Sequence, residues 1–291
     1  MLRSRNPIRR LVLRTLGVCG VAPFSLAIGQ AQSTLRFGTT PVFLNDHVET
    51  TARWRRYLVD ATGTNVQFVQ RGSYGEILEL LMRNDLDAAW VCGYPYVISK
   101  ARLELLATPI YHGKPLYQSY VIVPADDEAT RSIADLRNSI YAFSDPLSNS
   151  GYLVPKSELL RLGTTPEAFF RKAFFTFSHR KVVDAVRLGV ARGGSVDGYV
   201  WDTLAKQQPE STKGVRVAWR SREFGFPPVV VRKTLDGQLT ATLHRAFVNM
   251  ARTHAGQDVL TRLNLDGFGD APDSIFDGIA AMVRQVDGVK T

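Results

Sequence analysis

Cysteine is scarce in this sequence: among 291 residues there are two, Cys19 and Cys92. Only Cys92 remains if the leader discussed below is removed, and a lone cysteine cannot close a disulfide within its own chain. No Cys and His residues have the spacing of a zinc site. The sequence thus excludes a disulfide-stapled scaffold, and Cys92, in the apolar string AAWVCG, is expected to be a small buried residue.

Several functional signatures are also absent. The chain has no GxSxG nucleophile elbow, no Walker GxxxxGK[ST] loop and no GxGxxG after its first strand. It has no run of Lys and Arg of the kind that marks a nucleic-acid surface. We therefore expect no cofactor, no bound metal and no nucleic-acid partner.

The N-terminal segment lacks acidic residues and contains five arginines. The stretch TLGVCGVAPFSLAIG that follows them is too short and too interrupted by Gly and Pro to span a bilayer. GQA at 29–31 places small residues before a cleavage site, which predicts an export signal peptide over residues 1–31 and a periplasmic protein. General secretion and twin-arginine export both fit the string RRLVLR, and a lipid anchor on Cys19 or an uncleaved anchor are the alternatives. Removal of this segment lowers the net charge from +9 to +4.

Past the leader, short apolar runs alternate with amphipathic segments, which predicts open, mostly parallel α/β sheets. The alternation stops in the polar stretch ADDEATRSIADLRN and then starts again. We expect two lobes, with two chain crossings acting as a hinge. Residues 32–123 and 227–291 would form lobe 1, and residues 124–226 would form lobe 2, inserted into it.

Polar and aromatic residues recur where predicted strands end. In open α/β sheets this edge is where ligands lie. Each such residue also has a structural interpretation, as a helix cap or as an interface tyrosine. The residues concerned are Tyr74, Tyr94, Tyr96, Ser148, Asn149, Ser150, Ser178, His179 and Asp202.

The stretch DPLSNSG, residues 145–151, lies between the apolar run IYAF and a helical pattern. Ser and Asn at such a junction are typical helix caps. The first turn of a helix also offers N–H donors and a positive dipole end, which suit an anion. A serine hydrolase that combines a serine of this stretch with His179 and Asp202 is a third interpretation, although a nucleophilic serine usually stands alone on a strained turn.

The motifs of the second half resemble those of the phosphate/phosphite/phosphonate-binding receptors of bacterial ABC transporters. The resemblance rests on AFSDPLSNSGYLVPKSELLRLG, FSHRKVVDAVRLG, DGYVWD and VAWRSREFGFPPVVV, in this order and spacing, and it covers the mature chain. It implies a two-lobed, type II-like periplasmic binding protein in which each lobe is an open mixed sheet flanked by helices, with a two-crossing hinge.

The same resemblance implies a binding site for an oxyanion head group. It points to Ser148, Asn149 and Ser150, with His179 on the same lobe, and Asn149 stands where the family has Thr. Tyrosines of the other lobe, Tyr74 and Tyr117, would close over the ligand, and Tyr96 is a further candidate.

The resemblance also bears on the ligand's tail. Receptors for aminoalkylphosphonates bind the ammonium group with two acidic residues, and Asp202 falls at one of these positions. Phe226 or Pro227 stands at the other, so the resemblance favours phosphate, phosphite or an alkylphosphonate with an uncharged tail.

The chain is therefore expected to be a binding protein and not an enzyme. It would capture a phosphorus oxyanion and deliver it to a membrane permease, acting as a monomer. The alternatives are a periplasmic binding module that presents another small solute to a signalling partner, and the serine hydrolase described above.

Overall fold

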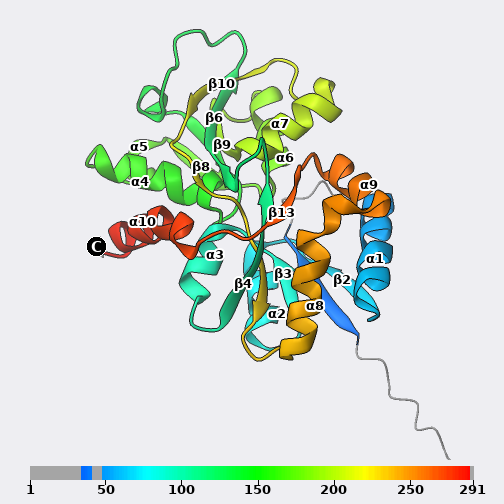
Figure 1. Ribbon diagram of the computed structural model, residues 1–291. Helices are drawn as coiled ribbons and strands as arrows, with labels where there is room; N and C mark the ends of the chain where they lie inside the picture. Colours follow the sequence, from blue (N-terminus) through cyan, green and yellow to red (C-terminus); the bar gives the residue numbers. More distant parts are fainter. Residues whose placement is uncertain (1–33, 41–47, 289–291) are drawn as a thin grey trace, which may run out of the picture. The chain divides into compact units, whose positions relative to one another are not determined.

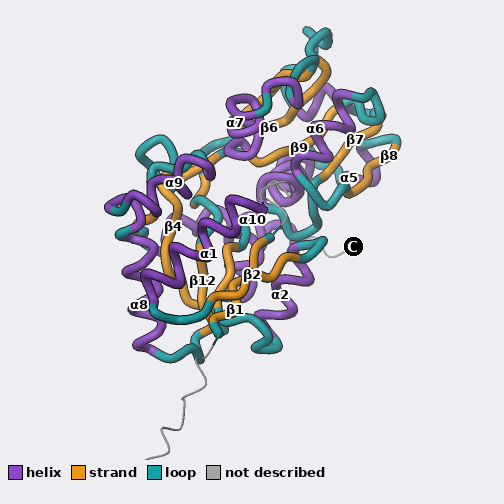
Figure 2. Tube along the Cα trace, turned by 90° about the vertical axis from the view of Figure 1, so that its right-hand side faces the viewer, coloured by secondary structure: helices purple, strands orange, loops and turns teal. Residues whose placement is uncertain are grey.

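The computed structural model of this chain describes residues 34–40 and 48–288. The predicted signal peptide, residues 1–31, lies outside the described residues. The described residues form two large sheets, whose strands make separate groups in Figure 2, and one short ribbon of two strands. Among the helices of this part of the chain, none has the length and apolar character needed to cross a bilayer.

The first large sheet is mixed and has six strands (Figure 1). Strand β1 lies between β2 and β3 and runs parallel to both, whereas β12 runs antiparallel to β3 and β4. The order of strands is β13 (Gly267–Gly269), β4 (Leu103–Ile110), β12 (Val229–Arg232), β3 (Ala88–Trp90), β1 (Leu35–Thr39) and β2 (Val66–Gln70).

The second large sheet is also mixed and has five strands. Strand β7 runs parallel to β8 and β9, and β6 runs antiparallel to β9 and β10. The order is β10 (Val215–Arg220), β6 (Ser119–Pro124), β9 (Gly193–Asp197), β7 (Ile140–Phe143) and β8 (Lys172–Phe175). Two open mixed sheets flanked by helices confirm the predicted fold class.

The chain passes between the two sheets twice. The first passage contains β5 (Leu116–Tyr117) and the second β11 (Phe224–Gly225), and these two strands pair with each other. Strand β6 belongs to the five-stranded sheet, although the prediction assigned residues 119–123 to lobe 1. The first passage therefore ends near residue 118, and the lobe boundaries as a whole stay a prediction.

Polar side chains fix where the helices begin. Ser73 accepts a hydrogen bond from the Glu76 N–H and so starts α2, and Asp197 accepts from the Tyr199 and Val200 N–H groups and starts α7. Against the six-stranded sheet, α1, α8 and α9 pack together. The α-helices are α1 (Val48–Thr62), α2 (Tyr74–Met82), α3 (Gly93–Ser99), α4 (Val154–Arg161), α5 (Pro166–Phe169), α6 (His179–Arg187), α7 (Gly198–Gln207), α8 (Gly237–Val248), α9 (His254–Leu263) and α10 (Asp277–Gly288).

Short single turns connect these elements. The turn η2 (Asn149–Leu153), which leads into α4, is a π-helical turn. The others are 3₁₀ turns: η1 (Ile133–Leu136), η3 (Pro209–Ser211), η4 (Met250–Arg252) and η5 (Asp273–Phe276).

Aromatic side chains form much of the core. Trp54 of α1 contacts Phe37, Trp90 and Phe247 at ring-centroid distances of 5.5, 5.6 and 6.2 Å. In the five-stranded sheet, Tyr141 stacks on Phe170 at 4.4 Å. Burial of large apolar side chains supplies the main stabilisation of such sheets, and it leaves the carboxyl ends of the strands as the place for polar groups.

Several elements differ from what their local sequence patterns predict. The helix expected over 94–104 ends at Ser99 and is followed by β4, because the buried string LLATP continues the six-stranded sheet. The strand expected over 195–200 ends at Asp197, since that residue caps α7. The helix α9 and the strand β13 were not predicted, because their apolar positions are few and acquire partners only in the folded chain.

Candidate functional site

The stretch DPLSNSG connects β7 to η2, and its three polar side chains at 148–150 are completely buried. The Ser148 hydroxyl accepts a hydrogen bond from the Gly151 N–H at 2.9 Å, which confirms the capping interpretation for this residue. The Asn149 N–H is also occupied, since it donates to the Cys92 sulfur at 3.2 Å. Two backbone donors of the turn therefore have protein partners, and its side chains are what can bind a ligand.

Three buried oxygen atoms around this turn have no hydrogen-bond partner among the described residues. They are Ser144 Oγ, Asn149 Oδ1 and Ser150 Oγ. A buried polar atom left without a partner costs about 1–3 kcal/mol, so such atoms indicate a missing ligand or water. Three of them within seven residues single out this turn as the candidate site.

Gly151 allows these groups to approach one another. A Cβ atom at this position would lie 1.8 Å from Ser144 Oγ and 3.1 Å from the Cε1 atom of His179. No side chain larger than hydrogen fits at the first of these distances. The glycine of the motif thus brings the turn, the end of β7 and His179 into contact.

His179 is the first residue of α6 and is buried, with 1% of its surface exposed. Burial lowers its pKa to about 3, so the imidazole is neutral. Its Nδ1 atom accepts the N–H of Asp197 at 3.0 Å, which places the ring proton on Nε2. His179 therefore presents an N–H donor, and the neutral form is the one that the folded chain holds.

Two tyrosines contact these residues. One comes from the helix that follows β2 of the six-stranded sheet, and the other comes from the first passage. Tyr74, the first residue of α2, has its hydroxyl 3.2 Å from His179 Nε2, and its N–H donates to Asp145 Oδ2 at 3.1 Å. The Tyr117 hydroxyl accepts from Asn149 Nδ2 at 2.9 Å. Burial raises the pKa of both tyrosines well above the ordinary value, so both hydroxyls keep their protons.

Cys92 is a buried residue between these elements, as its sequence context predicts. Burial raises the pKa of its thiol to about 11, so the sulfur is protonated at neutral pH. A protonated thiol is a poor nucleophile, and here it serves as the acceptor for the Asn149 N–H.

Asp202 lies in the second turn of α7, one turn beyond the position that the sequence predicted for it. Its Oδ2 atom accepts hydrogen bonds from the Tyr111 and Tyr120 hydroxyls, each at 3.1 Å. Tyr111 also packs against Phe226 at 6.0 Å. Phe226 in turn contacts the ring of Tyr117 at 5.7 Å, so aromatic rings connect Asp202 to the cluster at the turn.

Tyr96 is not brought into this cluster. Its hydroxyl donates to Asp273 Oδ1 at 2.7 Å, and its ring packs edge-on against Phe276 at 5.1 Å. Both contacts lie on the side of α3 that faces the C-terminal segment. The structure gives Tyr96 a packing role, which was the other interpretation of the strand-end tyrosines.

Sequence reasoning missed two buried carboxyl groups beside the site. Asp145 accepts the N–H groups of Leu147 and Tyr74, and Asp197 caps α7 next to His179. Each has 1% of its surface exposed. The available signals were the position of Asp145 inside the motif DPLSNSG and, for Asp197, an Asp–Gly pair directly before a helix.

The chemistry of this arrangement is that of a binding site. Both ring nitrogens of His179 have partners other than a serine, so the predicted residues do not assemble a Ser–His–Asp triad. Among the described residues, no group of three or more His, Cys, Asp or Glu side chains is arranged to hold a metal ion. What converges is a set of neutral hydroxyl and imidazole donors, together with the amide oxygen of Asn149.

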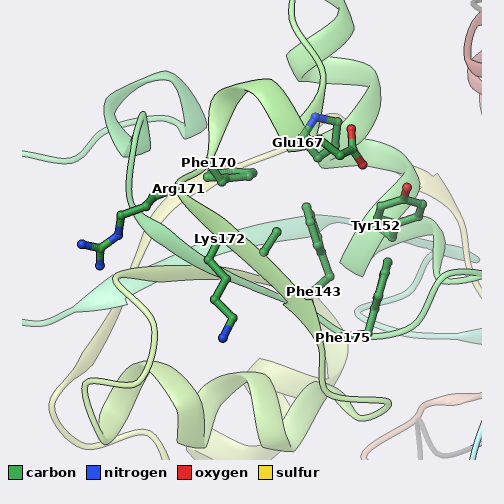
Figure 3. Close-up of a pocket in the computed structure, with 9 residues that line it drawn as sticks. Phe143, Tyr152, Glu167, Phe170, Arg171, Lys172 and Phe175 are labelled. Carbon is green, nitrogen blue, oxygen red and sulfur yellow. The ribbon is translucent and has the colours of Figure 1, made fainter. Parts of the chain in front are cut away.

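A separate cavity of about 170 Å³ lies beside the edge strand β8 (Figure 3). Aromatic rings line it, among them Phe143, Phe170 and Phe175, and Lys172 and Arg171 point away from the rings. It contains none of the predicted site residues. Its aromatic lining belongs to the core of the five-stranded sheet.

Curated proteins with related sequences are transport proteins. The chain is 25% identical over 253 residues to the phosphonates-binding periplasmic protein of Escherichia coli, covering 82% of this chain and 74% of that one. It is 29% identical over 160 residues to the phosphate-import protein PhnD of Mycolicibacterium smegmatis, covering 51% of this chain. In the second case the match spans about half of the relative's length, 49%.

Solved structures show the same fold. PhnD1 of Prochlorococcus marinus, in complex with methylphosphonate, superposes with a TM-score of 0.80 at 20% identity, covering 88% of this chain and 99% of that one. A binding-protein component of a phosphonate ABC transporter from Pseudomonas aeruginosa gives a TM-score of 0.79 at 21% identity, covering 87% and 86%. These are two-lobed periplasmic binding proteins, which confirms the predicted architecture.

The family comparison agrees with the geometry. Residues 37–276 match the family model described as "ABC transporter, phosphonate, periplasmic substrate-binding protein". This confirms the prediction of a binding protein rather than an enzyme, and it confirms the resemblance seen in the motifs. The chain belongs to the family of periplasmic substrate-binding proteins of phosphonate ABC transporters.

Proposed function

We propose that this chain captures a phosphorus oxyanion, namely phosphate, phosphite or a phosphonate, between its two lobes and delivers it to the permease of an ABC transporter. The observation that carries the proposal is the cluster of buried donors at the turn 148–150. Ser150 Oγ has no partner, and beside it the neutral Nε2–H of His179 and the Tyr74 hydroxyl contact each other at 3.2 Å. A tetrahedral oxyanion needs several converging donors of this kind.

The donors come from segments on both sides of the two passages. Ser150 and His179 follow strands of the five-stranded sheet, whereas Tyr74 opens a helix that follows a strand of the six-stranded sheet. A ligand that binds all three would contact residues from both sheets, so its binding would favour the closed state of the hinge. This supports Ser148, Asn149, Ser150, His179, Tyr74 and Tyr117 as the oxyanion residues.

The tail side of the proposed site is aromatic. Phe226 is fully buried, and its ring lies 5.7 Å from Tyr117 and 5.1 Å from Tyr199. An ammonium group would find one carboxylate there, Asp202, which already accepts two hydroxyl groups. We therefore propose that phosphate, phosphite or a short alkylphosphonate is preferred over aminoethylphosphonate.

The cellular setting is also a proposal. The relatives named above are a periplasmic protein and an import protein, and residues 1–31 have the composition of an export signal. We propose that the mature chain is a periplasmic monomer.

The test is calorimetric titration of the mature protein with phosphate, phosphite, methylphosphonate and aminoethylphosphonate. We expect saturable binding of at least one of the first three, and weaker binding of the last. Absence of binding to all four at millimolar concentration would contradict the proposal.

A matched pair of serine variants tests the site. Ser150→Ala should lower the affinity for every oxyanion that binds by about tenfold, which corresponds to loss of one hydrogen bond to a charged group. Ser157→Ala is the control, because Ser157 is also buried but bonds Gln285 on the far side of α4. Equal affinities in the two variants would remove Ser150 from the site.

A further inference from the structure

The proposed site is poor in positive charge. Within the described part of the chain, the hydrogen bonds of Ser148, Asn149, Ser150, His179, Tyr74 and Tyr117 involve no lysine or arginine. Arg180, the next residue along α6, has an interaction partner of its own. Arg220 lies over the ring of Tyr120, on the tail side. A dianion would therefore be held by neutral donors.

Negative charge, in contrast, lies close by. Asp145 Oδ2 accepts the N–H of Tyr74, and the N–H of Asp197 bonds the ring of His179. Both carboxyl groups are almost completely buried, and their charge adds to the effect of burial, which is the main reason that the pKa of Tyr74 is raised. Like charges at short range in a desolvated site disfavour each other, so a second negative charge on the ligand is costly here.

The site also contains an acceptor that lacks a donor. Asn149 Nδ2 donates to the Tyr117 hydroxyl, and the Oδ1 atom of the same side chain is buried and has no partner. A carbonyl oxygen can only accept a hydrogen bond. A fully deprotonated oxyanion has no hydrogen to offer it, whereas a P–OH group does.

We infer that the site binds its phosphorus oxyanion in the singly protonated form, with the P–OH group donating to Asn149 Oδ1 and the charged oxygens accepting from Ser150, His179 and Tyr74. This inference rests on the proposed function and specifies the ionisation state of its ligand. It also predicts rejection of sulfate, a dianion of the same shape that carries no proton near neutral pH.

Few groups around the site titrate in the useful range. Between about pH 6 and 9, Tyr74, Tyr117, Cys92 and His179 stay neutral, because burial moves their pKa values out of this window. Burial raises the pKa of Asp197 to about 7 and also raises that of Asp145. A proton taken up on binding therefore belongs to the ligand, to Asp197 or to Asp145.

The experiment is titration calorimetry of the mature protein with methylphosphonate at about pH 8.5, in two buffers with different ionisation enthalpies. Here the free ligand is mainly a dianion, so we expect about one proton to be taken up per ligand bound. The dissociation constant should rise about tenfold per pH unit above the ligand's second pKa. Sulfate at hundredfold excess should not displace the ligand.

Two comparisons locate the proton. Phosphite loses its second proton at lower pH than methylphosphonate. If the proton belongs to the ligand, the affinity for phosphite should therefore begin to fall at a lower pH than that for methylphosphonate as the pH is raised. Asp197→Asn keeps a residue that caps helices well, and proton uptake should persist in this variant.

The outcomes separate the two claims. Binding of methylphosphonate without proton uptake, loss of uptake in Asp197→Asn, or displacement by sulfate would overturn the inference and leave the proposed function intact. If no oxyanion binds at any pH, the proposed function fails and the inference fails with it.

Discussion

Ser148 and Ser150 are two residues apart and do different things. The Ser148 hydroxyl closes the first turn by accepting the Gly151 N–H, whereas the Ser150 hydroxyl has no partner although it is equally buried. Helix capping and ligand binding were alternatives when the stretch was considered as a whole. In the folded chain Ser148 caps the turn and the Ser150 hydroxyl remains available for the proposed ligand, so the two interpretations are compatible.

Asp202 provides a test of ligand preference at the level of one residue. Asp202→Ala should reduce the affinity for aminoethylphosphonate about tenfold more than that for methylphosphonate, because only the former carries an ammonium group that the carboxylate can bind. Calorimetric titration with both ligands measures the ratio. Asp184→Ala is a suitable control, since Asp184 is a surface residue of α6 paired with Arg187. Equal losses for the two ligands would show that Asp202 does not contact the tail.

At the scale of elements, the turn η2 and the helix α2 each contain a glycine near the site, and the two glycines differ in the space available for a side chain. Gly151→Ala would force its Cβ atom against the Ser144 side chain, at 1.8 Å from Oγ. Gly75, in the first turn of α2, has open space around it, with the nearest atom at 4.0 Å. The two substitutions are chemically identical and differ in their surroundings.

We expect Gly151→Ala to lower the free energy of unfolding by about 1–3 kcal/mol and to abolish oxyanion binding, because overpacking displaces the turn. Gly75→Ala should leave binding unchanged and raise stability by about 0.5–1 kcal/mol. Urea unfolding and a ligand titration of both variants give the answer. A Gly151→Ala protein that binds normally would show that the turn can shift without consequence.

Much of the element order follows from local sequence. Helices α1 and α2 are amphipathic, and the strands β1, β2 and β7 are apolar runs bounded by polar residues, so local patterns alone locate these elements. Leu103 and Glu104 at the start of β4 continue the helical pattern of the segment before them, and only pairing with β12 makes them part of a strand.

The site shows the same division between local and tertiary information. Ser148, Asn149, Ser150 and His179 stand at junctions that local patterns locate. Tyr96 has the same local pattern as Tyr74, and what separates them is Asp273, which lies 177 residues away and binds the Tyr96 hydroxyl. A single sequence gives no information on such a partner.

At the scale of the whole molecule, two buried groups act on stability in opposite directions as pH changes. The pKa of His179 is lowered to about 3, so its contribution is present above about pH 6.5 and is lost as pH falls. The pKa of Asp197 is raised to about 7, so its contribution is present below about pH 4 and is lost as pH rises. Between about pH 4 and 6.5 the contribution of His179 to the free energy of unfolding rises with pH while that of Asp197 falls, and the two changes cancel.

Variants that remove one of the two groups should reveal the pH dependence of the free energy of unfolding that the other group causes. Relative to the unmodified protein, the free energy of unfolding of Asp197→Asn should rise with pH by up to about 1.4 kcal/mol per unit across this window. That of His179→Gln should fall by a similar amount. Urea unfolding at three pH values within the window measures both. Parallel pH profiles for all three proteins would contradict the pKa shifts of these buried groups.

The proposed oxyanion residues are at most 3% exposed, and this has a kinetic consequence. We expect a ligand enclosed by them to leave only after Tyr74 has separated from Asp145 and His179. Its residence time is then the waiting time for this contact to break, whatever the chemistry of the tail. Ligands of different affinity would differ in how often they are recaptured before they escape, and a permease that pulls α2 away from the turn 148–150 would set the moment of release.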